Sequence, residues 1–197
     1  IGVLMDNMGP SLLAAVLSLP VLVYLMAGQT HPIALAVWAG LVLVLLIYRY
    51  RLIGIYRLRH DSLEGPQRMV FVERYRWSWT VMALLWGGPV ILSYQQASQT
   101  TQFVCGLVVL GQGLLTLTAF SAYLPIYRAY ANGLILTVFI GLVGATAHHI
   151  DMPDVLQTGV IFMVLLLVFW ALLQMAGSRL HLVHRSSFEL QFSNQEL

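Results

Sequence analysis

Six long apolar runs decide what this chain can fold into. They lie at about residues 11–27, 32–48, 77–94, 101–123, 131–147 and 155–176. A helix that crosses the hydrocarbon core of a bilayer needs about 20 mainly apolar residues. Only 9% of the residues are charged and the mean hydropathy is +0.80, whereas about a quarter of the residues in a soluble domain are charged. The sequence therefore predicts an all-α integral membrane protein, a six-transmembrane-helix bundle with the lipid bilayer as its partner.

The arginines predict the orientation of these spans. All ten basic residues are arginine. Seven lie between the second and third runs (Arg49, Arg51, Arg57, Arg59, Arg68, Arg74 and Arg76), one lies between the fourth and fifth (Arg128), and two follow the sixth (Arg179 and Arg185). Positively charged connections stay in the cytoplasm, so we expect a multi-pass protein with both termini in the cytoplasm. The arginines of segment 49–76 are expected to bind anionic lipid headgroups, and nothing beyond charge suggests nucleic acid as a partner.

The two inner connections are expected to differ in length. The first begins with RYRLIGIYRLRH, which is expected to prolong the second helix before a break at EGP. The second is short and contains PIYRAYAN, which we expect to form a turn between the fourth and fifth spans.

An apolar seam continues beyond the sixth run. Its positions alternate at spacings of three and four residues: Phe169, Leu173, Ala176, Leu180, Val183, Ser187, Leu190, Asn194 and Leu197. Such a seam is typical of a coiled coil, and a polar Asn at one seam position fixes register and strand number. The sequence therefore predicts that the last span continues as one helix into a parallel homodimeric coiled coil in the cytoplasm. The alternative is an amphipathic helix that lies on the inner membrane face, which Phe188 and Phe192 favour.

The exit segment SRLHLVHRSSFELQFSNQEL resembles the junction in bacterial signalling proteins where a polytopic sensor leads into a histidine kinase or a diguanylate cyclase of the GGDEF type. The segments RYRWSWTVMALLWG and AYLPIYRAY are also similar to that six-span family. The junction residues that carry the resemblance are Arg179, Leu180, His181, Ser187, Leu190, Phe192, Asn194 and Leu197.

The resemblance implies a receptor of the bacterial inner (cytoplasmic) membrane. Residues 1–178 would form a six-helix transmembrane sensor domain and residues 179–197 the start of a cytoplasmic signalling helix. We expect an output domain after Leu197: the kinase of a two-component system or a cyclase. No kinase or cyclase motif lies within these residues, so we expect no catalytic residue and no enzyme activity in this segment.

Polar and small residues inside the spans are candidates for a ligand site. Polar groups at membrane depth are costly and tend to face the bundle interior. We expect a small lipophilic signal to bind between helices near Trp86, Tyr94, Gln112 and Thr116. The alternative for Gln112 is an interhelical hydrogen bond. The alternative for the adjoining Gly87-Gly88-Pro89 is a kink that serves packing.

A second polar cluster, ATAHHIDMPD, lies at the outer end of the fifth span. His148, His149 and Asp151 are expected at the mouth of the ligand site, with an ordinary polar turn as the alternative reading. His148 and His149 are weak candidates for metal or haem, and no cofactor is predicted. The single cysteine, Cys105, excludes an intramolecular disulfide.

Two other function classes remain open from the sequence. One is a passive membrane anchor and dimerisation module without a ligand. The other is a small transporter, which is disfavoured because no Asp, Glu or Arg lies in the middle of any run.

Overall fold

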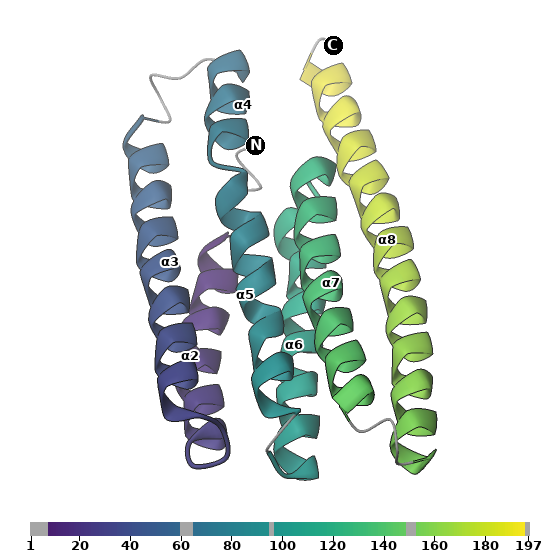
Figure 1. Cartoon of the computed structure of the whole chain (residues 1–197). Helices are drawn as coiled ribbons and strands as arrows, with labels where there is room; N and C mark the ends of the chain where they lie inside the picture. Colours follow the sequence, from purple (N-terminus) through teal and green to yellow (C-terminus); the bar gives the residue numbers. More distant parts are fainter. Residues whose placement is uncertain (1–7, 60–64, 95–96, 149–152, 196–197) are drawn as a thin grey trace.

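The computed structural model describes residues 8–59, 65–94, 97–148 and 153–195, and the regular structure in these residues is entirely helical. Figure 1 shows the helices side by side in one bundle, with the C-terminal end of the last helix beyond the end of α7. In chain order the helices are α2 (Met8–Met26), α3 (Pro32–Arg59), α4 (Gly65–Arg74), α5 (Trp77–Ser93), α6 (Gln99–Phe120), α7 (Leu124–His148) and α8 (Pro153–Gln195).

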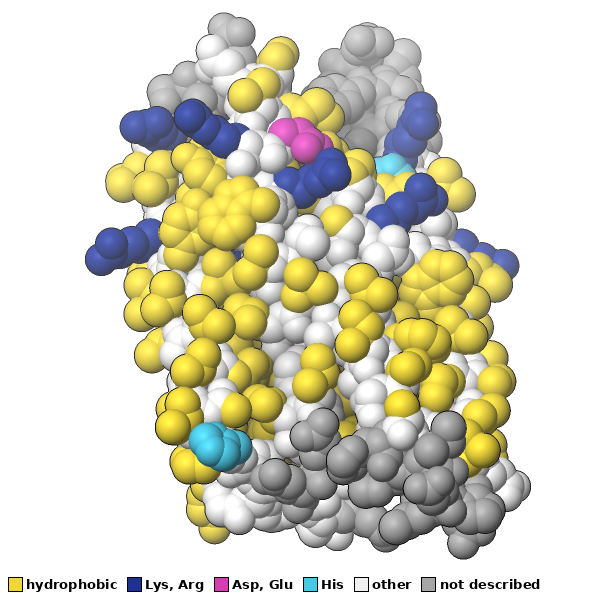
Figure 2. Space-filling view, viewed as in Figure 1, with side chains coloured by type: hydrophobic (Ala, Val, Ile, Leu, Met, Phe, Trp, Pro, Cys, Tyr) yellow, Lys and Arg dark blue, Asp and Glu magenta, His cyan; other side chains and the backbone are white. Residues whose placement is uncertain are grey.

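Within the described residues, five helices are long and apolar enough to cross a membrane: α2, α3, α6, α7 and α8. Their outward side chains are mostly apolar, as Figure 2 shows over the middle of the molecule, and such side chains suit contact with lipid. The chain is therefore an all-α membrane bundle, as predicted. The remaining long apolar helix, α5, has 17 residues and lies inside the bundle, between α3, α6 and α7.

Two boundaries bear on the functional site. RYRLIGIYRLRH was expected to prolong the second helix, and α3 confirms this by continuing without a break to Arg59. PIYRAYAN was expected to be a turn, and this prediction is wrong, because these residues form the first turns of α7. A proline in the first turn of a helix costs little, since the amide that it lacks has no intrahelical partner there.

Glycines bring α5 and α7 into close contact. A Cβ atom added to Gly87 would lie 2.4 Å from the Cβ of Thr137, and one added to Gly133 would lie 3.2 Å from the Cβ of Ala83. Membrane helices associate through such small residues, because lipid provides no hydrophobic force between them and close van der Waals packing has to replace it. The α5–α7 pair is therefore the centre of the bundle.

The Gly87-Gly88-Pro89 segment binds a side chain of α3. Pro89 has no amide to donate to the carbonyl of Leu85, one turn earlier. The indole Nε1 of Trp38 donates to that carbonyl instead, at 2.7 Å. A Cβ atom on Gly88 would lie 2.7 Å from the indole ring, so only glycine leaves room for it. The backbone hydrogen bond that α5 lacks at Pro89 is thus replaced by one from α3.

This exchange of donors predicts a measurable coupling. Trp38→Phe should lower the free energy of unfolding by about 1 kcal/mol, because it leaves the Leu85 carbonyl without a donor. In a Pro89→Ala background the restored amide can donate to that carbonyl, so the same substitution should cost less. Thermal unfolding in detergent gives the four values of the cycle. Trp170→Phe, which removes a different indole hydrogen bond, should cost the same in both backgrounds. Equal costs for Trp38→Phe in both would contradict the assignment.

One carboxamide joins two segments of the chain at the end of the bundle where α2 and α3 meet. The chain reverses there at Gly28, whose φ of 77° lies in the left-handed region that favours glycine. The Oε1 atom of Gln29 then accepts from the amide of Ser98 at 2.9 Å and from the hydroxyl of Thr101 at 3.0 Å. Ser98 is also the N-cap of α6. This contact, the Gln29 clamp, joins the α2–α3 turn to the start of α6.

Candidate ligand site around Arg49

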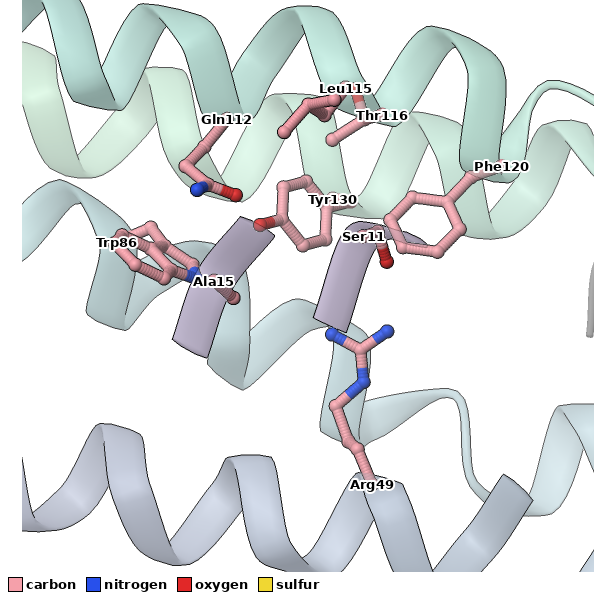
Figure 3. A pocket seen from close by; sticks show the side chains of 9 residues that line it. All are labelled: Ser11, Ala15, Arg49, Trp86, Gln112, Leu115, Thr116, Phe120 and Tyr130. Carbon is pink, nitrogen blue, oxygen red and sulfur yellow. The ribbon is translucent and has the colours of Figure 1, made fainter. Parts of the chain in front are cut away.

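A cavity lies among α2, α3, α5, α6 and α7, toward the arginine-rich end of the bundle. Figure 3 shows the nine residues that line it, with side chains from different helices pointing toward one another. The free space is narrow and has room for about one water molecule. A larger molecule can therefore enter only if helices move apart.

Three of the predicted ligand residues line this cavity together. They are Trp86 from α5, which is 1% exposed, and Gln112 and Thr116 from α6, both buried. Tyr94, the fourth, is not among the lining residues; it is half-buried at the C-terminal end of α5. The structure shows that Trp86, Gln112 and Thr116 lie close together. Their contact with a ligand stays a prediction.

Gln112 and Thr116 also have structural partners. Gln112 Nε2 donates to the hydroxyl of Ser18 at 3.3 Å and so joins α6 to α2. Thr116 donates its hydroxyl to the carbonyl of Gly113 in its own helix. The alternative reading of Gln112 as an interhelical hydrogen bond therefore has direct geometric support, although each carboxamide carries two N–H donors and only one is used here.

Arg49 brings to the cavity N–H donors that are unpaired within the described residues. Its side chain reaches from α3 toward α6 and α7 (Figure 3) and is only 5% exposed. Its guanidinium lies 5.6 Å from the ring of Trp79 and 5.8 Å from the ring of Phe120, within the range of cation–π attraction. Its Nε and Nη2 atoms have no hydrogen-bond partner in the described part of the chain. A buried charge without an opposite charge costs several kcal/mol.

Arg49 does not stand out in the sequence, because it is one of seven arginines in segment 49–76. The signal that distinguishes it is helical spacing. The buried positions of α3 include Val42, Leu45, Leu52 and Tyr56, and Arg49 falls in the same stripe at steps of three or four residues. Arg51 lies off the stripe and is exposed. Arg49 therefore faces the bundle, and the prediction that it binds lipid headgroups with its neighbours does not fit its burial.

Arg49 also lines a second cavity of similar size. The other residues that line this one are all apolar or aromatic: Met8, Leu52, Ile53, Phe71 and Trp79. By contrast, the first cavity contains the carboxamide of Gln112 and the hydroxyls of Thr116 and Tyr130. The guanidinium thus borders a polar space and an apolar space.

Two contacts connect the cavity to α8. Phe120 precedes Ser121, whose carbonyl accepts a hydrogen bond from Nδ1 of His181 at 3.0 Å. The rings of Phe120 and Tyr130 are in contact, with centroids 5.2 Å apart. One turn before Tyr130, the hydroxyl of Tyr127 donates to the backbone carbonyl of Leu173 in α8. The cavity therefore adjoins two residues that bind α8.

A polar contact lies beside these, at the turn between α6 and α7. The Tyr123 hydroxyl donates to Glu73 of α4, and Arg76 binds the same carboxylate at 3.3 Å. Burial raises the pKa of the Tyr123 hydroxyl, and its bond to Glu73 raises that pKa further. Tyr123 therefore stays a neutral donor, and Glu73 is engaged on both sides.

The predicted dimer seam is placed only in part. Leu173 is 2% exposed and packs inside the bundle, whereas Leu180, Val183 and Ser187 are exposed and Ala176 is half-buried. The side chains of Leu190, Asn194 and Leu197 lie outside the described part. Pairing between copies stays a prediction, and the described seam positions that are exposed for it are Leu180, Val183 and Ser187.

The predicted cluster of His148, His149 and Asp151 lies outside the described side chains, because the description of α7 ends at the backbone of His148. Among the side chains that are described, no three His, Cys, Asp or Glu residues come close enough to hold a metal ion. Cys105 is buried.

Comparison of the chain with protein-family models, with curated proteins and with solved structures finds no match in any of the three.

Proposed function

We propose that this chain is the membrane-embedded sensory input module of a bacterial signal-transduction receptor. It detects a small lipophilic signal and passes it through α8 to a C-terminal histidine kinase or diguanylate cyclase. The observation that carries the proposal is the length of α8. Its 43 residues form one helix of about 65 Å, about twice the thickness of the hydrocarbon core. A helix of that length connects the membrane bundle rigidly to whatever follows it.

The proposed topology has six spans with both termini in the cytoplasm of the inner membrane. The span that is added to the five long helices is α5, the third in chain order, whose 17 residues cover about 26 Å. Although short, α5 is apolar and packs among the other spans. The arginines gather toward the upper end of the molecule in Figure 2, where α4 and the end of α8 lie. The cytoplasmic preference of arginine-rich connections supports placing that end inside the cell.

The proposed transmission uses the contacts between the cavity and α8. A molecule that separates Phe120 from Tyr130 would shift the Ser121 carbonyl, which holds His181, and the Tyr127 hydroxyl, which holds Leu173. Packed helices change between discrete arrangements rather than bending continuously. The bundle would therefore respond by moving α8 as one body, and a paired α8 would transmit that movement.

Cysteine crosslinking in native membranes tests the pairing of α8. In a Cys105→Ser background, Val183→Cys and Ser187→Cys should form intermolecular disulfides readily. Leu182→Cys and Ser186→Cys, which are also exposed but lie off the seam, should crosslink weakly, because coiled coils bring only seam positions together. Equal crosslinking at all four positions, or none, would contradict a dimeric signalling helix and favour a helix that lies on the membrane.

A passive anchor and dimerisation module is the second candidate function. The Gln112–Ser18 hydrogen bond and the narrow cavity favour it, since both fit a bundle that is only glued together. The two functions differ in one respect: an input module changes its crosslinking when a ligand binds, and an anchor does not.

A further inference from the structure

We propose that Arg49 is the receptor for the carboxylate of an amphiphile with a short apolar tail, of the medium-chain fatty-acid type. The carboxylate binds the guanidinium, and the tail occupies the apolar cavity beside it. Its role as the signal rests on the proposed function, whereas the binding itself does not.

The free donors of Arg49 select a planar anion. Nε and Nη2 lie on the same edge of the guanidinium, and their N–H bonds are parallel. Both are buried without a partner in the described residues. Two parallel N–H donors match the two oxygens of a carboxylate, which makes bidentate pairs of this kind stronger and more specific than a single bond. One carboxylate in the plane of the guanidinium would therefore pair with both free donors of Arg49.

The described part of the protein does not supply that carboxylate itself. Glu73 is the one acidic residue whose side chain is described there, and it binds Tyr123 and Arg76. The rings of Trp79 and Phe120 stabilise the cation but satisfy none of its N–H groups. An ionisable side chain held inside a membrane bundle in this way is typical of a functional site.

The surroundings of Arg49 are amphipathic in the same sense as the ligand. On one side, Gln112 and Tyr130 add donors that can reach a carboxylate in the polar cavity. On the other side, Leu52, Ile53 and Phe71 line the apolar cavity, where a tail that leaves the lipid gains van der Waals packing against these side chains. A bilayer phosphodiester fits less well, because its phosphorus bears two further substituents beside the anionic oxygens, so it would need a wider opening of the helices than a carboxylate does.

Binding of the ligand has to open the bundle. The cavity is too narrow for a carboxylate with its tail as it stands, so the occupied state has wider helix spacing around Arg49. Phe120 and Tyr130 line the polar cavity and touch each other. These are the residues next to the two contacts on α8, so occupancy and the position of α8 are coupled.

The test is the binding of radiolabelled decanoate to the full chain in phosphatidylcholine nanodiscs. Arg49→Gln should weaken binding at least about tenfold, the loss expected when a charge-assisted pair is removed. Arg51→Gln, on the same helix but exposed, should leave it within about twofold. Arg49→Lys keeps the charge without the fork and should fall between them. Decanol, which has the tail but no charge, should compete poorly with decanoate. Arg49→Gln should fold normally, because it removes an unpaired buried charge.

Several outcomes would overturn the site. They are equal binding of decanoate by the wild type and Arg49→Gln, absence of binding by the wild type, and competition by decanol as strong as that by unlabelled decanoate. Stronger competition by decyl phosphate, or loss of decanoate binding in phosphatidylglycerol nanodiscs, would assign Arg49 to a phosphate or a lipid headgroup instead.

The same sample separates this site from the proposed function. In the Val183→Cys variant, decanoate should change the yield of intermolecular disulfide, and Arg49→Gln should abolish that change. Binding that depends on Arg49 without any change in crosslinking would leave the site in place and contradict the sensory role. Regulated output from a receptor that does not bind decanoate would do the reverse.

Discussion

Gly87→Ala is expected to lower the free energy of unfolding by about 3 kcal/mol, the upper part of the range for overpacking. The added Cβ atom would lie 2.4 Å from the Cβ of Thr137 and 3.3 Å from the amide nitrogen of Val138. Both atoms belong to or adjoin the backbone of α7, so neither can rotate away. The helices α5 and α7 have to separate, and the packing at the centre of the bundle is lost with them.

The control for Gly87 is another glycine in a membrane helix. Gly111→Ala places a Cβ atom with nothing within 4 Å and should be neutral or slightly stabilising, because alanine favours the helix. Thr137→Ala should not rescue Gly87→Ala, since alanine keeps the clashing Cβ atom, whereas Thr137→Gly should restore part of the loss. Thermal unfolding in detergent measures all of these variants. Equal stability of Gly87→Ala and Gly111→Ala would contradict the close α5–α7 contact.

Gly177→Ala is expected to have a comparable effect, and it acts on α8. The new Cβ atom would lie 2.1 Å from the ring of Tyr127, which is fully buried. Either α8 moves outward or the ring is displaced, and both break the hydrogen bond from Tyr127 to Leu173. We expect a loss of about 2 kcal/mol in the free energy of unfolding and an altered pattern of disulfides at Val183→Cys and Ser187→Cys.

Two substitutions of Tyr127 separate the ring from its hydroxyl. Tyr127→Phe keeps the ring and should not rescue Gly177→Ala, whereas Tyr127→Leu removes the clashing atoms and should rescue part of the stability. On its own, Tyr127→Phe should cost about 1 kcal/mol, the value of one hydrogen bond. If Gly177→Ala leaves both stability and crosslinking unchanged, α7 does not hold α8 at this point, and the proposed transmission loses one of its two contacts.

The helices of the bundle could be predicted from the sequence because apolar runs report directly on the solvent around a span. Where polar residues interrupt an apolar run, the predicted start of the helix is wrong. The fifth span was expected from residue 131, but α7 begins at Leu124, since Arg128 and the tyrosines interrupt the run. In the structure Arg128 is exposed while Tyr127 and Tyr130 are buried. Hydropathy averages over all faces of a helix, whereas only one face of this part of α7 is buried in the bundle.

The candidate site could be predicted in part for a related reason. Trp86, Gln112 and Thr116 are exceptions within apolar runs, such exceptions tend to face inward, and the structure brings these three residues to one cavity. Arg49 lies at the border of a run, where arginines are ordinary. Arg49 differs from Arg51 in the face of α3 on which it lies. Which face of α3 is buried depends on the helices that pack against it, and the sequence of α3 alone does not show this.

The Gln29 clamp identifies the end of the bundle that lies farther from Arg49. A single carboxamide bonds to Ser98 and Thr101 and so joins the α2–α3 turn to the start of α6, at the end of the bundle farthest from the arginines. Arg49 lies 20 residues further along the chain, almost entirely along α3, which is about 26 Å or more away. The shorter route to it for an amphiphile is therefore through the opposite leaflet, between helices or past α4. In the topology proposed above that leaflet is the cytoplasmic one, so the ligand proposed for Arg49 would arrive from the inner face of the membrane.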